Sequence, residues 1–242
     1  MMKEYKIIEA YLDYNSFSRS GKKMKGIKGV VIHWVANPKS TAMANRNYFN
    51  NLKNQTKTYA SSHEIIGLDG EVVICIPSNE VAYHVGANKY TTRIEQMKIG
   101  NPNYYFYGIE CCHPDWGGKF NDKTYNTLIN RVADLLIEFD LKPSKDTIWR
   151  HYDITFKDCP HYYVKNPKEW DKLIADVTRK YNEKIEVLFM KELKEWQKEM
   201  GTKAITSLAN KKIVNNPEEW LKSLGEDTPQ WLFWSIIDRI TK

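Results

Sequence analysis

The chain has 242 residues and a formal net charge of +6 at pH 7, enough for one substantial domain with its own hydrophobic core and a small appendage. Its four cysteines are Cys75, Cys111, Cys112 and Cys159. Two are adjacent, which suits reduced thiols in a reducing cytosol and argues against a disulfide-rich secreted domain. On a strand, Cys111 and Cys112 would point to opposite faces.

Residues 1–26 carry acids and tyrosines where a signal peptide needs an apolar core, and no apolar run approaches the roughly 18 residues of a membrane span. We therefore expect no stable membrane insertion. The positive charge is spread along the chain without a basic stripe or a known reader motif, so we expect no nucleic-acid partner. Mild attraction to a polyanion and an ordinary solvated surface fit this charge about equally well.

The first predicted element is a strand over residues 27–35, a run rich in branched apolar residues that ends before an Asn-Pro pair. Residues 41–54 have helical spacing of their apolar side chains. Residues 61–77 form two extended runs joined by Asp69-Gly70, the strongest short hairpin signal.

A further strand is predicted over residues 104–113, and an amphipathic helix over 124–141 that ends before Pro143. Residues 146–151 indicate a last short strand with His151 at its exit, and 166–181 a helix opened by an Asn-Pro pair. This order predicts an α/β fold with a mixed central sheet flanked by helices.

From about Arg179 the chain becomes charged, glycine-poor and helical in pattern. We expect a main domain at residues 1–178 and a small all-α C-terminal module at 179–242. Asn216-Pro217 and Thr228-Pro229 are the predicted helix starts in this module.

Cys159 is the cysteine with unusual surroundings, because Lys157 and Asp158 precede it and a proline follows it. From these residues alone, a core position, a metal ligand and a nucleophile all stay open. A catalytic zinc takes three protein ligands and leaves a fourth position for water. His151 and Cys159 could share such an ion, and His33, at the end of an apolar strand, is the best candidate for the third ligand, although buried histidines are usually only hydrogen-bonded.

Residues 25–178 resemble the zinc-dependent N-acetylmuramoyl-L-alanine amidases of the amidase-2 type, which include phage lysozyme-type amidases and peptidoglycan recognition proteins. The resemblance rests on several motifs in order: "VVIHW" (30–34), "SSHEIIGLDGEV" (61–72), "VAYHVG" (81–86), "YGIE" (107–110) and "HYDITFKDCP" (151–160). It implies a zinc amidase catalytic domain at residues 1–178. One Zn²⁺ would be held by His33, His151 and Cys159 and completed by water.

The resemblance also implies further site residues. Glu110 matches the glutamate that many members use as general base, and Lys157 matches the lysine that stabilises the transition state. His84 and Gly86 match a substrate-facing H-x-G element. Zinc would generate the nucleophile from water. Glu110 would accept the proton of this water, and Lys157 would stabilise the oxyanion.

One position departs from the family pattern: phage lysozyme-type members carry a tyrosine where this chain has Ser62. We interpret His63 as structural, and Asp153 as a loop-capping residue or a support behind the site residues, not as a catalyst. His113 and His161 lie near the motifs and could contact the substrate, but we interpret them as solvated loop residues.

The implied function is zinc-dependent hydrolysis of the amide between N-acetylmuramic acid and L-alanine in bacterial peptidoglycan, by a phage or prophage endolysin that causes cell lysis. Such an enzyme would be made in the bacterial host cytoplasm without a signal peptide and would act on the wall after release, through a holin pore if phage-encoded. The alternatives are a non-catalytic peptidoglycan-binding receptor of the same fold, whose members usually lose the cysteine, and a cysteine hydrolase that uses Cys159 and His151.

The C-terminal module has no catalytic constellation. Its tryptophans fit core packing, and they also fit a face for cell-wall binding, to wall teichoic acid for example, or for association with another copy of the chain. The second interpretation is motivated by "WLFW" at residues 231–234. The tryptophans are Trp196, Trp220, Trp231 and Trp234.

Overall fold

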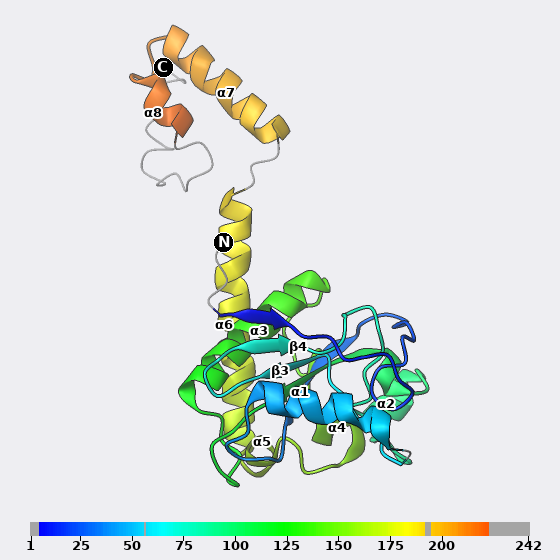
Figure 1. The fold of residues 1–242 in the computed structure, drawn as a ribbon. Helices are drawn as coiled ribbons and strands as arrows, with labels where there is room; N and C mark the ends of the chain where they lie inside the picture. The colour runs from blue at the N-terminus through cyan, green and yellow to red at the C-terminus, as the bar shows by residue number, and fades with distance from the viewer. Residues whose placement is uncertain (1–4, 56, 192–194, 223–242) are drawn as a thin grey trace. The chain divides into compact units, whose positions relative to one another are not determined.

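The computed structural model of the protein describes residues 5–55, 57–191 and 195–222 (Figure 1). The chain divides into two compact units, residues 1–181 and 182–242. Within the described ranges, no helix combines the length and the apolar character needed to cross a bilayer.

The first unit is built on a sheet whose strands run in the order β1-β4-β3-β5-β2-β6. Only β3 and β4 pair antiparallel, as the Asp69-Gly70 hairpin predicts, and the other neighbours are parallel. The predicted mixed sheet is therefore confirmed. The strands are β1 (Ile7–Glu9), β2 (Gly29–Trp34), β3 (Glu64–Ile66), β4 (Val72–Ile74), β5 (Phe106–Cys111) and β6 (Ile148–Arg150).

Helices cover both faces of this sheet, with α1 on one side and α3 and α6 on the other (Figure 1). In chain order the helices are α1 (Ala42–Asn51), η1 (Leu52–Asn54), α2 (Thr92–Met97), η2 (Pro102–Tyr104), α3 (Asp122–Glu138), α4 (His151–Thr155), α5 (His161–Lys165), α6 (Pro167–Lys191), α7 (Glu195–Asn210) and α8 (Pro217–Lys222). The labels η1 and η2 denote short 3-10 helices.

The alternation of side chains along β5 divides the core into layers. Cys111 packs with α3 and α6 on one face, whereas Cys112 packs with α1 on the other, so the predicted opposite orientation of the two thiols is confirmed. Strand β2 is buried over almost its whole length, because α3 lies against one of its faces and α4 against the other. A strand buried on both faces reads as a continuous apolar run, as residues 29–32 do.

Several short elements of this unit are not apparent from the sequence, among them β1, α2, α4 and α5. Strand β1 has three residues and pairs in parallel with β4 at the edge of the sheet. Helix α4 has five residues and starts immediately after β6, so His151 opens a helix instead of closing a strand. Elements this short carry too few residues to show a period.

The C-terminal unit contains α7 and α8, and Asn216-Pro217 begins α8 as predicted. Trp196 is 55% exposed, so core packing is wrong for this tryptophan. Thr228-Pro229, Trp231 and Trp234 lie outside the described residues. Helix α6 runs through the boundary between the units, and the functional division at residue 178 stays a prediction.

Candidate metal centre

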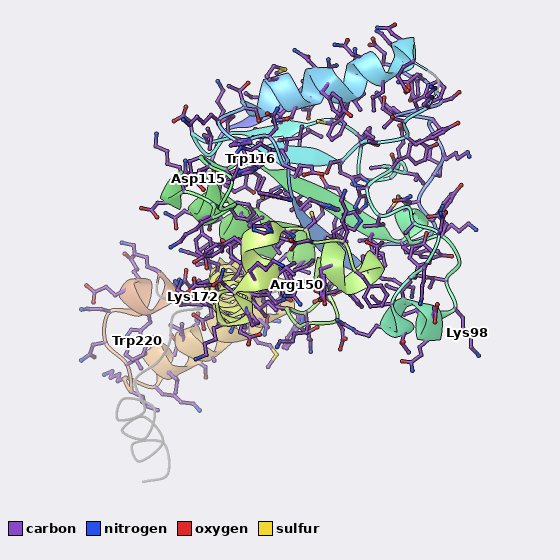
Figure 2. All side chains as sticks on the ribbon, turned by 90° about the horizontal axis from the view of Figure 1, so that it is seen from below. Lys98, Asp115, Trp116, Arg150, Lys172 and Trp220 are labelled. Atoms are coloured by element: carbon purple, nitrogen blue, oxygen red, sulfur yellow. The ribbon has the colours of Figure 1, made fainter. Side chains whose placement is uncertain are left out.

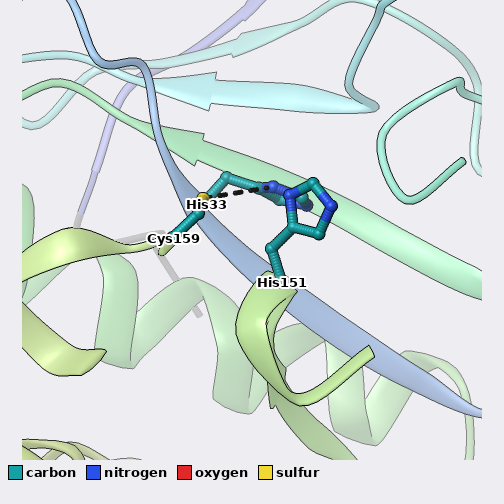
Figure 3. A group of neighbouring side chains, drawn as sticks. All are labelled: His33, His151 and Cys159. Carbon is teal, nitrogen blue, oxygen red and sulfur yellow. Dashed lines mark hydrogen bonds between the residues drawn. The ribbon is translucent and has the colours of Figure 1, made fainter. Parts of the chain in front are cut away.

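Three side chains from separate segments converge where the central parallel strands end. His33 comes from β2, His151 is the first residue of α4, and Cys159 follows that helix in a loop (Figure 3). Strands β2 and β6 are parallel neighbours, and Ile32 lies opposite Arg150. The residues that follow these two, His33 and His151, therefore lie side by side. All three side chains are buried, and their ligand-type atoms lie within 4.8 Å of one another.

Helix α4 is held in place by its own capping residues. Asp153 accepts a hydrogen bond from the Arg150 backbone N–H at 2.9 Å, and the Arg150 guanidinium donates to the same carboxylate. Beyond the helix the chain turns at Phe156, whose φ is 66°. The Tyr152 N–H donates a hydrogen bond to the Cys159 carbonyl at 2.9 Å. This bond holds Cys159 close to the first turn of the helix. The capping role expected for Asp153 is confirmed.

Burial sets the protonation state of the three candidate ligands. It lowers the pKa of His151 to about 3, with a smaller contribution from the charge of Lys157, and it lowers the pKa of His33 well below the usual value. Burial also raises the pKa of the Cys159 thiol, and the nearby Glu110 adds to this effect. Both imidazoles are therefore neutral and offer a lone pair, while the thiol needs a cation to become a thiolate.

The geometry of the group fits a tetrahedral metal ion. His33 Nδ1 lies 3.7 Å from Cys159 Sγ, and bonds of about 2.0 Å to nitrogen and 2.3 Å to sulfur would separate two such ligands by about 3.5 Å. His151 Nδ1 is buried and has no hydrogen-bond partner among the residues that the structure describes. A buried nitrogen without a partner is costly unless a further group binds it. The group could thus hold a metal ion.

Glu110 stands beside this group with a carboxylate that is only partly engaged. It lies opposite His33 in the pairing of β5 with β2, and its Oε1 is 3.9 Å from His33 Nδ1. Its Oε2 is buried and has no partner within the described ranges. Burial raises the pKa of Glu110 to about 8, and the positive charge of Lys157 opposes the shift. Lys157 itself is exposed.

A cavity of about 770 Å³ opens over these groups, a size typical of small-ligand sites, which span about 300–1,000 Å³. The structure brings every site residue expected from the sequence to this cavity. They are His33, His84, Gly86, Glu110, His151, Lys157 and Cys159.

His84 has contacts that its motif does not predict. The ring is buried, and its Nδ1 lies 3.0 Å from His33 Nε2 while its Nε2 lies 3.0 Å from the Phe106 carbonyl. Burial lowers the pKa of His84 to about 4. Because "VAYHVG" lies in an irregular segment, no periodicity indicates where this side chain points.

Ser62 and His63 lie behind the site, against the backbone of β5. His63 Nδ1 accepts a hydrogen bond from the Gly108 N–H at 2.9 Å, and its Nε2 lies 2.9 Å from the Glu80 carbonyl. The Ser62 hydroxyl donates to the Gly108 carbonyl at 2.8 Å. Both side chains are fully buried. The structural interpretation of His63 is confirmed, and the Ser62 hydroxyl is engaged by the backbone.

Aromatic rings from β2, from α5 and from the loop after β5 lie close together beside the site. Trp34 stacks on His113 and on His161, with ring centroids 4.6 Å and 5.3 Å apart. His113 is fully buried and its Nδ1 bonds the Asp115 carbonyl, so its interpretation as a solvated residue was wrong. Trp116 is 67% exposed, and Figure 2 labels it next to Asp115.

The model of the N-acetylmuramoyl-L-alanine amidase family matches residues 22–162, more than half of the chain. The chain belongs to this amidase family. A probable N-acetylmuramoyl-L-alanine amidase of Bacillus licheniformis is 35% identical over 161 residues, which make up 66% of this chain and 44% of that protein. The endolysin PlyTW of Staphylococcus phage Twort is 25% identical over 218 residues, 88% of this chain and 42% of that protein. The chain therefore spans less than half the length of these two relatives.

Solved structures support the amidase fold. A mutant endolysin from Bacillus subtilis matches with a TM-score of 0.56 at 24% identity, covering 72% of this chain and 99% of that one. The resemblance expected from the motifs and the predicted α/β fold are thus confirmed. All three candidate metal ligands lie within the region that the family model matches.

Proposed function

We propose that the protein is a zinc-dependent hydrolase of the amide between N-acetylmuramic acid and L-alanine in bacterial peptidoglycan. The observation that carries this proposal is the buried group of His33, His151 and Cys159 lining a cavity in a chain of the amidase family. Two imidazoles and a thiolate are ligands that zinc prefers, and three protein ligands leave a fourth position for water, as catalytic zinc sites do.

Zinc bound by these residues would supply a Lewis acid that polarises the amide carbonyl and acidifies water. Glu110 would take a proton from the attacking water on its carboxylate and pass it to the departing amine nitrogen, and its pKa of about 8 suits a group that exchanges a proton near neutrality. The Lys157 ammonium would face the carbonyl oxygen as negative charge develops there.

Gly86 is the part of the H-x-G element that this proposal assigns to the substrate. It lines the cavity, and a Cβ at this position would come within 3.4 Å of the Asn103 amide. The absence of a side chain leaves room for a substrate to approach the backbone.

The test is the release of free amino groups and of reducing sugar ends from purified peptidoglycan, with zinc-loaded and chelated protein side by side. We expect amine release that stops on chelation and returns with zinc, without new reducing ends. Cys159→Ala should abolish it. Cys75→Ala, the same change at a buried cysteine in the core beneath α1, should not. Binding to peptidoglycan without either product, with zinc present, would instead identify a non-catalytic receptor.

The same assay separates the metal mechanism from a cysteine hydrolase. Burial raises the pKa of the Cys159 thiol, and buried thiols of this kind are poor nucleophiles. Activity that survives chelation but is lost on alkylation would favour the cysteine mechanism.

A lytic role as a phage or prophage endolysin is part of this proposal, supported by the likeness to PlyTW. We expect added protein to lower the turbidity of permeabilised bacteria, and Glu110→Gln to abolish the effect. Synthesis in the host cytoplasm and holin-dependent release stay predictions.

A further inference from the structure

A chain of two hydrogen-bonded histidines leads from a backbone carbonyl to the candidate metal centre. His84 Nε2 lies 3.0 Å from the Phe106 carbonyl oxygen, and His84 Nδ1 lies 3.0 Å from His33 Nε2. Because a carbonyl oxygen only accepts, His84 Nε2 carries the proton. Both rings are buried and neutral, so each has one N–H and one lone pair.

The proton on His84 Nε2 determines which nitrogen donates in the other hydrogen bond, between the two histidines. His84 Nδ1 holds the lone pair and accepts, so His33 Nε2 donates to it. His33 therefore keeps its own lone pair on Nδ1, the nitrogen that lies 3.7 Å from Cys159 Sγ. The tautomer of His33 that can bind a metal in this group is the one that His84 selects.

The backbone around His84 holds its ring in this orientation. Asn103 Oδ1 accepts hydrogen bonds from the backbone N–H groups of His84 and Val85, at 3.0 Å and 2.9 Å. On the other side, a Cβ at Gly108 would lie 2.7 Å from His84 Cγ and Nδ1. Only glycine leaves room for the ring against this strand, which accounts for the glycine of "YGIE".

We propose that His84 is a positioning residue that fixes the tautomer and the orientation of His33 for metal binding, and that it acts through His33 without contacting the substrate. This inference rests on the metal centre of the proposed function. Partners that hold the second nitrogen of a histidine ligand typically contribute about 10- to 100-fold to metal affinity.

The first experiment compares zinc affinity among variants of the full chain, by competition with a chromophoric chelator. His84→Leu removes both ring nitrogens, and we expect its zinc dissociation constant to rise by about 10- to 100-fold. His84→Asn keeps a polar group near the place of Nδ1 and should recover part of the loss. His113→Leu is the control, since His113 is a buried histidine bonded to a carbonyl but to no candidate ligand.

Kinetics at saturating zinc separate a positioning role from substrate contact. We expect the KM of His84→Leu for peptidoglycan fragments to match that of the unmodified protein, because only zinc affinity changes. A raised KM with unchanged zinc affinity would overturn the proposal. Gly108→Ala, which pushes the ring aside without removing it, should weaken zinc binding in the same way if His84→Leu fails to fold.

The second experiment reads the tautomer in the unmodified protein without any variant. Long-range ¹H–¹⁵N correlation spectra of the metal-free protein should show His33 protonated at Nε2 and bare at Nδ1. A proton on His33 Nδ1 would contradict the inference. If the protein binds no zinc at all, the proposed function fails on the affinity measurement, whereas the tautomer is still decided by this spectrum.

Discussion

Glu110 carries the clearest residue-level prediction, because one of its carboxylate oxygens is buried without a partner among the described residues. Glu110→Gln keeps the shape of the side chain but removes its ability to accept the proton of water. We expect kcat for amine release to fall by about 10²- to 10⁴-fold. Zinc content, measured by atomic absorption, should stay at one ion per chain. Loss of zinc together with activity would show that Glu110 supports the metal site instead.

Lys157 should contribute less than Glu110, because it is exposed and water screens its charge. Loss of one oxyanion donor in a closed site costs about 10²- to 10³-fold in kcat. For Lys157→Met we expect a loss at the lower end of that range, with little change in KM. Lys157→Arg keeps the charge and should retain most of the activity. Equal losses in the two variants would refute a role based on charge.

The sequence predicts the candidate metal ligands better than the groups around them. His33, His151 and Cys159 stand within motifs that resemble those of the amidase family, and the resemblance implies that all three are metal ligands. The contact of His84 with His33 depends on how an irregular loop packs against β5, and no local pattern encodes that packing. The burial of His113 could not be predicted from the sequence for the same reason, because only the fold places this residue against Trp34.

At the level of elements, long periodic segments and strands joined by a strong turn signal are predictable, whereas short segments with neither feature are not. The helix expected at 124–141 is α3, and the hairpin around Asp69-Gly70 joins β3 and β4. Strand β1 is missed because its three residues gain their structure from β4, a partner distant in sequence. Such an edge strand is specified by tertiary contacts more than by its own propensity.

The segment between β1 and β2 is tied to the rest of the first unit by a buried ion pair. Arg19 Nε lies 2.8 Å from Glu80 Oε2, with side chains 10% and 5% exposed. The Arg19 guanidinium also donates to the Leu12 carbonyl and lies over the Tyr14 ring. Removing one partner of a buried pair costs about 3–5 kcal/mol, because the other charge is left without compensation.

This ion pair predicts a dependence of stability on pH. The hydrogen bond from Arg19 holds the pKa of Glu80 below its usual value, so the ionised pair stabilises the fold above about pH 4.5, and the contribution is lost as the pH falls through the lowered pKa. We expect Glu80→Gln to lower the Tm at pH 7, and the difference from the unmodified protein to shrink towards pH 3. Asp69→Asn, in a pair with side chains 84% and 66% exposed, is the control and should change the Tm little at any pH.

At the scale of the whole molecule, the first unit has what it needs to fold alone. The core clusters of the described residues draw all their members from positions 5–181. Helix α6 contributes Trp170, Leu173 and Val177 to the core, and these precede the boundary at residue 181. A domain with its own complete core is expected to fold independently.

We therefore predict that deletion of residues 185–242 separates catalysis from attachment. The shortened chain should hydrolyse small soluble peptidoglycan fragments at the rate of the full chain, since every site residue precedes the cut. Its binding to intact cell walls in a sedimentation assay should fall, or its mass in solution should drop from that of an oligomer to that of a monomer. These two outcomes separate a wall-binding module from a self-association module.

Trp196→Ala, at an exposed aromatic side chain of α7, should reproduce part of the loss, because exposed tryptophans suit both kinds of contact. Unchanged wall binding together with an unchanged mass would leave the C-terminal unit with neither role.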